Sequence, residues 1–181
     1  MKFVNVKIVN NSGLPLPKYQ TEGSAGLDLN ADVAQFVTEG FMQKPNRVYG
    51  CVRLSRCEGD PKDAIIHMGG GSQVLVPTGI FIQLPEGFEA DIRPRSGLAL
   101  KNGITVLNTP GTIDCDYTGQ VHVLLWNTRD TEFVIHHGDR IAQMVVLNYA
   151  KVSFKECDLC DFDKTSRGAN GHGSTGVVAI N

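Results

Sequence analysis

Short apolar runs separated by turn-forming residues constrain the fold of this chain more than any other feature of its sequence. Such runs occupy residues 73–84, 89–92, 103–107, 120–126, 132–135 and 141–147. Glycine, proline, threonine and aspartate lie between them, and the chain holds 20 glycines and 8 prolines among 181 residues. Residues 3–9 nearly alternate apolar and polar side chains, as in a half-buried strand. The pattern predicts an all-β fold, either a barrel or a sandwich.

Two segments depart from this pattern of short strands. Residues 96–101 form the one convincing helical stretch, in which Ser96 is able to cap the first turn and Gly103 to end the last. Residues 38–72 form a long connection that is irregular or carries its own hairpin, and positive charges exceed negative ones in its middle. A loop of that length in a compact domain is usually functional or disordered.

Charge and hydropathy exclude several classes of protein. Seventeen Lys and Arg against 19 Asp and Glu give a formal net charge of −2, so no global positive field attracts a nucleic acid or an anionic membrane. No apolar run reaches the 18 or so residues that span a bilayer. The five cysteines show no disulfide framework, and the first residues do not resemble a signal peptide. We therefore expect a cytoplasmic protein without a nucleic-acid or membrane partner.

The length and composition predict one domain followed by a mobile arm. We expect a β-barrel domain over residues 1–163, with the irregular insertion at about 38–72. Residues 164–181 are rich in glycine and polar side chains, which cannot pack a core, so they are expected to form the arm.

Three local groups of residues indicate anion or phosphate chemistry. Arg95-Ser96-Gly97 opens the short helix and is either an anion site or simply a helix start. Residues 111–119 contain Asp114 and Asp116, which project to one face of extended backbone, with Tyr117 on the other. One of these carboxylates is a candidate general base, and the alternative is a polar turn between strands. The glycine-rich residues 167–176 resemble phosphate-cradling loops but lack the strand-to-helix context of a P-loop.

Taken in order, five segments of the sequence resemble the five motifs of trimeric dUTP pyrophosphatases (dUTPases). They are residues 24–29, residues 95–98, Asn108 with residues 111–119, residues 138–143 and residues 167–176. All five occur in the family's order, and the resemblance covers nearly everything except the insertion.

The resemblance implies a jelly-roll-like β-barrel of the β-clip type that assembles as a homotrimer, with active sites shared between subunits. It implies Mg²⁺-dependent hydrolysis of dUTP to dUMP and pyrophosphate, which removes dUTP from the nucleotide pool and supplies dUMP for dTMP synthesis. On the family's pattern Asp114 is the general base, which activates a water for attack on the α-phosphorus. Asp28 matches the carboxylate that holds Mg²⁺ through water.

The same resemblance assigns the substrate-binding residues. Tyr117 matches the tyrosine that packs on the deoxyribose and leaves no room for a 2′-hydroxyl. The uracil-reading element is matched by the hairpin 103–122, within which we expect contacts from Asn108, Gly111, Thr112, Ile113 and His122. The family's phosphate-binding residues are matched by Arg95, Ser96, Gly97 and Gln143, and by Arg167, Gly173, Ser174 and Thr175 of the closing arm.

His172 departs from the family's usual pattern, because many members carry a phenylalanine that stacks on uracil at this position. A histidine is more polar and titrates near pH 6.5, so substrate binding through the arm is expected to weaken below about pH 6.

Alternative functions remain open at this point. The first alternative is a dCTP deaminase, an enzyme of the same fold whose chemistry resembles one that needs a glutamate on the strand after the hairpin. Residues 120–127 contain no carboxylate, which argues against this alternative. A dUTP-gated module that binds a protein partner through the insertion belongs to a different class. Cysteines and a histidine also make a structural zinc site conceivable, namely Cys51, Cys57, His67, Cys157 and Cys160.

Overall fold

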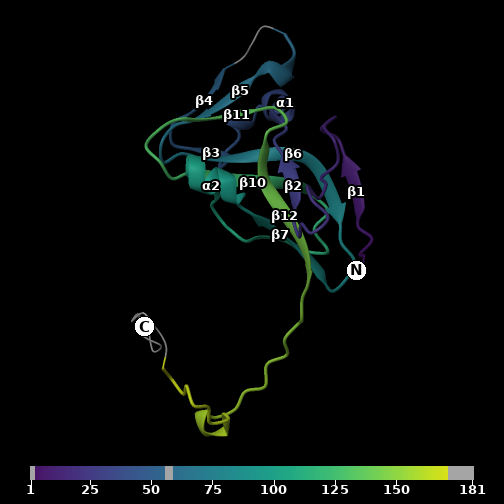
Figure 1. Cartoon of the computed structure of the whole chain (residues 1–181), viewed down its shortest axis with the longest axis vertical. Coiled ribbons are helices and arrows are strands. Elements are labelled where there is room, and N and C mark those ends of the chain that lie inside the picture. The colour runs from purple at the N-terminus through teal and green to yellow at the C-terminus, as the bar shows by residue number, and fades with distance from the viewer. Residues whose placement is uncertain (1–2, 56–58, 171–181) are drawn as a thin grey trace. The chain divides into compact units, whose positions relative to one another are not determined.

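A computed structural model describes residues 3–55 and 59–170 of the chain. The chain divides into two units, residues 1–150 and residues 151–181, which are described separately. The first unit is built from antiparallel strands with two short helices (Figure 1). The expected all-β class is therefore confirmed. No helix in the described part of the chain is long and apolar enough to cross a membrane.

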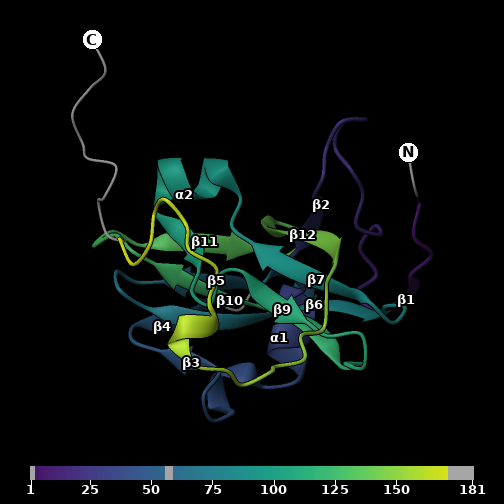
Figure 2. The ribbon, with the colours of Figure 1, turned by 90° about the horizontal axis from the view of Figure 1, so that it is seen from below.

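Three antiparallel sheets make up the first unit. The largest joins β1 (Lys7–Asn10), β6 (Gln73–Gln83), β10 (Gln120–Asn127) and β8 (Ile104–Val106), with β3 (Val48–Tyr49) also on β6. The second contains β2 (Leu27–Asn30), β12 (Arg140–Asn148), β7 (Phe88–Arg93) and β9 (Gly111–Ile113), which appear side by side in Figure 2. The third joins β11 (Phe133–His136), β5 (Ile65–Met68) and β4 (Val52–Ser55).

Alternating side chains of these strands build one hydrophobic core. In β10, Val121, Val123 and Leu125 are completely buried, whereas Trp126 is 36% exposed on the other face. The strands from β6 onward, apart from β9, agree with the expected runs to within two residues at each end, because each run has one apolar face. Strand β9 was not among the expected runs. The N-terminal strand is shorter than expected and begins only at Lys7.

Helix α2 (Ser96–Asn102) forms where expected but begins differently. Arg95, not Ser96, occupies the N-cap position, and no side chain caps the first turn. Gly103 ends the helix with φ of +68°, as expected, and its missing side chain leaves room for Arg129, whose Cγ would lie 2.6 Å from a Cβ there.

The insertion is ordered where the structure describes it. It contains η1 (Phe41–Gln43), β3, β4 and η2 (Pro61–Asp63), and its own hairpin is confirmed by the antiparallel pairing of β4 with β5. An additional helix, α1 (Val33–Thr38), precedes it and was not expected; Asp32 caps this helix by accepting from the Gln35 amide at 3.0 Å. Helix α1 packs against η1, η2 and β6.

Aromatic packing ties the insertion to the barrel core. Phe36 of α1 and Phe41 of η1 are 0% and 2% exposed, and their ring centroids lie 5.4 Å apart. Phe41 also packs on the His122 ring at 5.7 Å, while the Lys44 ammonium lies 4.6 Å from the Phe41 centroid. The insertion is therefore part of the core rather than a solvated loop.

The described residues of the second unit, 151–170, form one short 3-10 turn, η3 (Leu159–Asp161), and all of them are exposed. The structure divides the chain after Ala150, where the last barrel strand has ended, so the expected boundary after residue 163 falls inside this unit.

We predict that Phe41→Ala lowers the free energy of unfolding by about 3–5 kcal/mol, because the substitution leaves a cavity between Phe36 and His122. Urea denaturation of the full chain measures this loss. Phe154→Ala, at a position 91% exposed in the second unit, is the matched control and should change stability by less than about 0.5 kcal/mol. Equal effects of the two substitutions would contradict a core role for Phe41.

Candidate active site

A buried carboxylate held by two arginines forms the centre of the candidate site. Asp28 on β2 is 9% exposed, and its Oδ1 accepts a hydrogen bond from Arg95 Nε at 3.1 Å. Its Oδ2 accepts from Arg140 Nη1 at 3.2 Å. Arg95 Nη1 also donates to the Arg140 carbonyl at 3.0 Å, so the two arginines are connected to each other as well as to Asp28.

Strand register explains why these residues meet. β12 lies between β2 and β7, and Gln143 of β12 is directly opposite both Asp28 and Arg93. Arg95 follows β7 by two residues, so its side chain reaches back to β2 across the end of β12. The structure thus brings together Asp28, Arg95 and Gln143, three residues predicted from the sequence. Arg140, which was not predicted, joins them; an arginine two residues after Gly138 in the fourth motif was the available signal.

The Gln143 side chain lies close to a glycine across the sheet. Its Nε2 donates to the Pro94 carbonyl at 2.8 Å. A Cβ at Gly26 would lie 2.5 Å from Gln143 Oε1, so a larger residue at position 26 would displace this amide from the position that it has here. Gln143 therefore fixes the segment that leads from β7 to Arg95 and Ser96.

A hollow of about 240 Å³ opens beside Asp28. Its polar lining includes Lys18, Gln20, Asn30 and Arg140. With Arg95 next to it, this region holds three cations against the single buried carboxylate. Such a local excess of positive charge suits an anionic ligand, although the whole chain is slightly acidic.

Asp114 lies on a tight turn that follows β9. The Tyr117 amide donates to the Asp114 carbonyl at 3.1 Å, which closes the turn. The expectation that Asp114 and Asp116 project to one face of extended backbone is therefore wrong, because the backbone between them reverses direction. Both carboxylates are exposed to solvent.

Glycines shape the surroundings of Tyr117 and Asn108. The Tyr117 hydroxyl donates to the Gln120 carbonyl at 2.8 Å, and a Cβ at Gly119 would lie only 2.5 Å from that hydroxyl oxygen. The Asn108 amide nitrogen would be 3.0 Å from a Cβ at Gly111. The ring and the amide are thus packed closely over glycine backbone, while Thr112 remains exposed and Ile113 is half-buried against the core.

Strand register also separates Asp114 from the arginine-bound Asp28. In the β7–β9 pair Ile92 faces Gly111 and Ala90 faces Ile113, so Asp114 is level with Glu89. Four residue steps, roughly 13 Å along β7, separate that level from Arg93, and Arg95 lies two residues further in the same direction. Within one chain the candidate general base and the cationic cluster lie toward opposite ends of the sheet.

His122 lies on β10, where its ring is half-buried beneath Phe41. Its Nδ1 is 3.0 Å from the Gln120 carbonyl. Burial lowers the pKa of His122 from its usual value of 6.5, and the hydrogen bond to Gln120 opposes this shift. The side chain thus contacts the insertion.

In the second unit, Arg167 belongs to a local turn in which its Nε donates to the Asn170 carbonyl at 2.9 Å. The predicted residues His172, Gly173, Ser174 and Thr175 lie outside the described residues.

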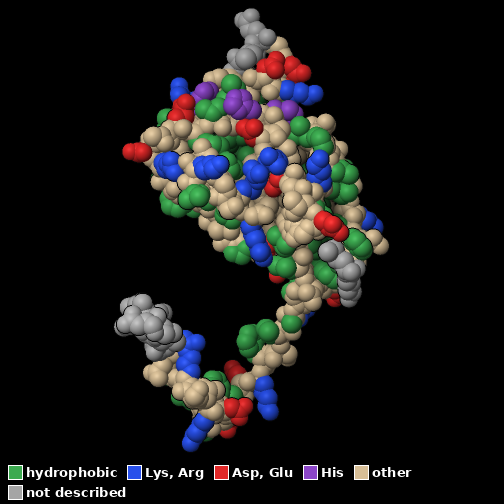
Figure 3. Space-filling view, in the orientation of Figure 1, with side chains coloured by type: hydrophobic (Ala, Val, Ile, Leu, Met, Phe, Trp, Pro, Cys, Tyr) green, Lys and Arg blue, Asp and Glu red, His purple; other side chains and the backbone are tan. Residues whose placement is uncertain are grey.

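Among the described residues of the first unit, those of the conceivable zinc site form no metal-ligating cluster. His67 uses both ring nitrogens, with Nε2 2.8 Å from Ser55 Oγ and Nδ1 3.0 Å from Glu132 Oε1. Glu132 in turn pairs with Arg53. Figure 3 shows histidine side chains gathered over this end of the unit, near β5 and β11. Cys51 is exposed, and Cys57 lies outside the described residues.

In the second unit, ligand atoms of Asp158, Cys160 and Asp161 lie within 4.8 Å of one another, all on exposed residues. The two aspartates already form a capping box around η3.

Comparisons with known proteins agree on one family. The dUTPase family model matches residues 60–176. The deoxyuridine 5'-triphosphate nucleotidohydrolase of Rickettsia bellii is 45% identical over 174 residues, which are 96% of this chain and 95% of that one. The enzyme of the same name from Fusobacterium nucleatum is 38% identical over 176 residues, covering 97% and 99% of the two chains.

Solved structures share the fold. The dUTPase of Staphylococcus bacteriophage 80alpha, solved with dUPNHPP, has a TM-score of 0.70 at 18% identity and covers 98% of this chain and 100% of its own. The dUTPase of phage phi11 of S. aureus has a TM-score of 0.61 at 16% identity, over 89% and 100% of the two chains, and its structure shows a structural Mg(II) ion.

We predict that acid destabilises the folded chain partly through His122. Because burial lowers its pKa in the folded state, the unfolded chain binds a proton more readily below about pH 6.5, and stability falls as the pH decreases through this range. Thermal melts of wild type and His122→Gln between pH 7.5 and 5.5 should show a shallower decline in the variant. Phe154→Ala, at a position 91% exposed in the second unit, serves as the control and should decline like wild type; a wild-type slope in His122→Gln would contradict the prediction.

Proposed function

The chain belongs to the dUTPase family and is a hydrolase that converts dUTP to dUMP and pyrophosphate, and we propose that Asp114 is its general base. The match of the family model over residues 60–176, which include Asp114 and Tyr117, carries this assignment. Asp114 is exposed and held by a closed turn, so its carboxylate is accessible to a water beside a bound nucleotide. It would take the proton of that water as the water attacks the α-phosphorus.

We propose that the cluster around Asp28 binds the metal-bound triphosphate. Arg95, Ser96, Gly97 and Gln143 would hold phosphate oxygens. A carboxylate has about four lone-pair positions, and the two arginines occupy one on each oxygen of Asp28. The remaining positions would accept hydrogen bonds from water molecules around Mg²⁺, a hard cation that keeps several waters and prefers oxygen ligands. Bound there, Mg²⁺ would neutralise phosphate charge.

The nucleoside would bind at the hairpin between β8 and β10. Tyr117 would pack on the deoxyribose and exclude a 2′-hydroxyl. Asn108 and the hairpin backbone would pair with uracil, and a cytosine base would leave buried donors and acceptors unpaired. We assign Gly111, Thr112, Ile113 and His122 to this element by the family's pattern, although the His122 ring packs on Phe41.

We further propose a homotrimer with shared active sites in the cytoplasm. The levels of Asp114 and Arg93 differ by roughly 13 Å along β7, and Arg95 lies beyond. A single triphosphate reaches both groups more readily when Asp114 of one copy meets the cationic cluster of another. The arm would then close over the nucleotide, with Arg167, Ser174 and Thr175 on the phosphates, Gly173 close to them and His172 over the base.

The runner-up reaction, deamination of dCTP, finds no support on the neighbouring strand. None of the residues of β10 is a carboxylate. Hydrolysis at the phosphate therefore remains the function that the site supports best.

We predict that Asp114→Asn lowers the rate of pyrophosphate release from dUTP by a factor of roughly 10²–10⁴ while dUTP still binds, because the amide cannot accept the proton of the water. Release from dCTP, dTTP and UTP should be slow with the wild type. Asp116→Asn changes a second exposed carboxylate on the same turn and should retain activity. Wild-type turnover by Asp114→Asn, or an equal loss in Asp116→Asn, would overturn the assignment.

Shared sites predict complementation between inactive variants. Arg95→Ala and Asp114→Asn should each be inactive alone, yet a mixture that is unfolded and refolded together should regain a fraction of wild-type turnover. The gain arises because some sites combine an intact Arg95 from one copy with an intact Asp114 from another. A mixture as inactive as its components would argue that both residues serve the same substrate from one chain.

A further inference from the structure

One face of the three-stranded sheet carries a serine, a histidine and a glutamate that are hydrogen-bonded in series. Ser55 Oγ lies 2.8 Å from His67 Nε2, and His67 Nδ1 lies 3.0 Å from Glu132 Oε1. The other carboxylate oxygen of Glu132 accepts a hydrogen bond from Arg53. Serine, histidine and carboxylate connected in this order are the parts of a nucleophile, its base and the group that orients the base.

The register of the sheet explains why these side chains meet. β5 lies between β4 and β11, and His67 of β5 is directly opposite Arg53 on one side and Val134 on the other. Ser55 follows Arg53 by two residues, and Glu132 lies just ahead of β11, two residues before Val134. Both side chains therefore share the face of His67 and lie diagonal to it, one on each side.

The hydrogen-bond partners determine where the protons of this cluster lie. Hydrogen bonds from His67 and Arg53 lower the pKa of Glu132, so Glu132 is ionised at neutral pH and can only accept. His67 Nδ1 must then carry the proton that Glu132 accepts. In a neutral imidazole the other nitrogen is an acceptor, so His67 Nε2 receives the hydrogen bond from the Ser55 hydroxyl. The base thus faces the proton that a nucleophilic serine must lose.

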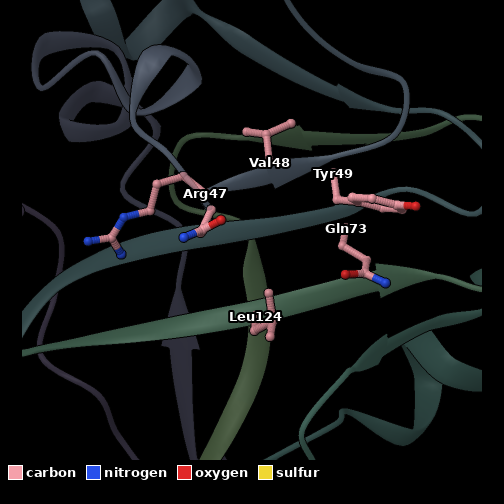
Figure 4. A pocket seen from close by; sticks show the side chains of 6 residues that line it. Arg47, Val48, Tyr49, Gln73 and Leu124 are labelled. Carbon is pink, nitrogen blue, oxygen red and sulfur yellow. The ribbon is translucent and has the colours of Figure 1, made fainter.

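The hollow between β3, β6 and β10 offers no comparable chemistry. Its volume is about 260 Å³, and Figure 4 shows Arg47, Tyr49 and Gln73 among the six residues that line it. None of the six side chains is a base at neutral pH. The serine cluster, and not this hollow, therefore indicates a second reaction.

We propose that Ser55 is the nucleophile of a separate acyl-transfer site, with His67 as its general base and Glu132 as the residue that orients the base. Ser55 is exposed, whereas the His67 side chain is only 20% exposed, so the nucleophile is accessible while its base is held in place. An exposed serine on a strand favours small activated esters as substrates. The cluster shares no residue with the candidate active site.

The reaction needs only an ester and water. Ser55 Oγ forms a bond to the carbonyl carbon of the ester while its proton passes to His67 Nε2. The imidazolium, stabilised by Glu132, returns this proton to the alcohol oxygen as the bond from that oxygen to the carbonyl carbon breaks. Water then attacks the acyl group on Ser55 and loses a proton to His67, which passes it to Ser55 Oγ as the carboxylic acid leaves.

The test uses the full chain with p-nitrophenyl acetate as the ester. Wild type should release nitrophenolate and, after acid quenching, carry an acetyl group on Ser55 that peptide mass spectrometry locates. His67→Gln should slow acetylation of Ser55 by a factor of roughly 10², because it removes the general base. Ser55→Ala should lose this acetyl group. Ser153→Ala, at an exposed serine of the second unit, is the matched control and should behave like wild type.

Glu132→Gln distinguishes an oriented base from a serine that reacts only because it is exposed. The variant leaves Ser55 accessible but removes the carboxylate, so acetylation should slow by roughly tenfold or more. Because Ser55 and Glu132 are both exposed, their variants should melt like wild type. No acetyl group on Ser55 in wild type, or equal acetylation in wild type, His67→Gln and Glu132→Gln, overturns the proposal. Turnover of dUTP should be unchanged in Ser55→Ala, so the two reactions are judged independently.

Discussion

The double ion pair on Asp28 is the interaction on which the rest of the site depends. A carboxylate this deeply buried is costly unless it is paired, and Arg95 and Arg140 each donate to one of its oxygens. The pairing requires β12 to lie between β2 and β7 in the observed register. The barrel topology and the chemistry are therefore linked, since a slip of one residue in β12 would turn Arg140 away from Asp28.

The sequence predicted the positions of the strands more accurately than the geometry of the site. Runs such as residues 73–84 and 141–147 were visible because one face of each strand is apolar, and Gly103 marked the end of α2. Helix α1 was missed because six residues are too few for helical periodicity to emerge. Arg140 was not predicted because its contact with Asp28 depends on the pairing of β12 with β2, which the sequence alone does not show. At Asp114 the sequence left extended backbone and a polar turn both open, and the structure shows the turn, which the hydrogen bond from the Tyr117 amide to the Asp114 carbonyl closes.

The insertion shows how a long connection becomes structural. Phe41 places it in the core, where its ring packs on Phe36 of the preceding helix α1 and on His122 of β10. Its length and charge led us to expect an irregular connection or a hairpin, because charged residues outnumber its few aromatic side chains. Burial of the Phe41 ring outweighs that surface charge, since burying a phenylalanine side chain contributes about 1.5–3 kcal/mol and an exposed ion pair only about 0–1 kcal/mol.

Strand β6, the longest strand, shows what the insertion contributes to the edges of the largest sheet. One edge of β6 is paired with β10, and β1 covers only residues 80–83 of the opposite edge. Strand β3 occupies residues 73 and 74 of that edge, and the Asp32 amide donates to the Pro77 carbonyl between them. Without β3, the chain would offer a free backbone edge on its longest strand, which is a template for aggregation. Strand β3 of the insertion thus pairs backbone groups at this end of β6 that would otherwise lie on an open sheet edge.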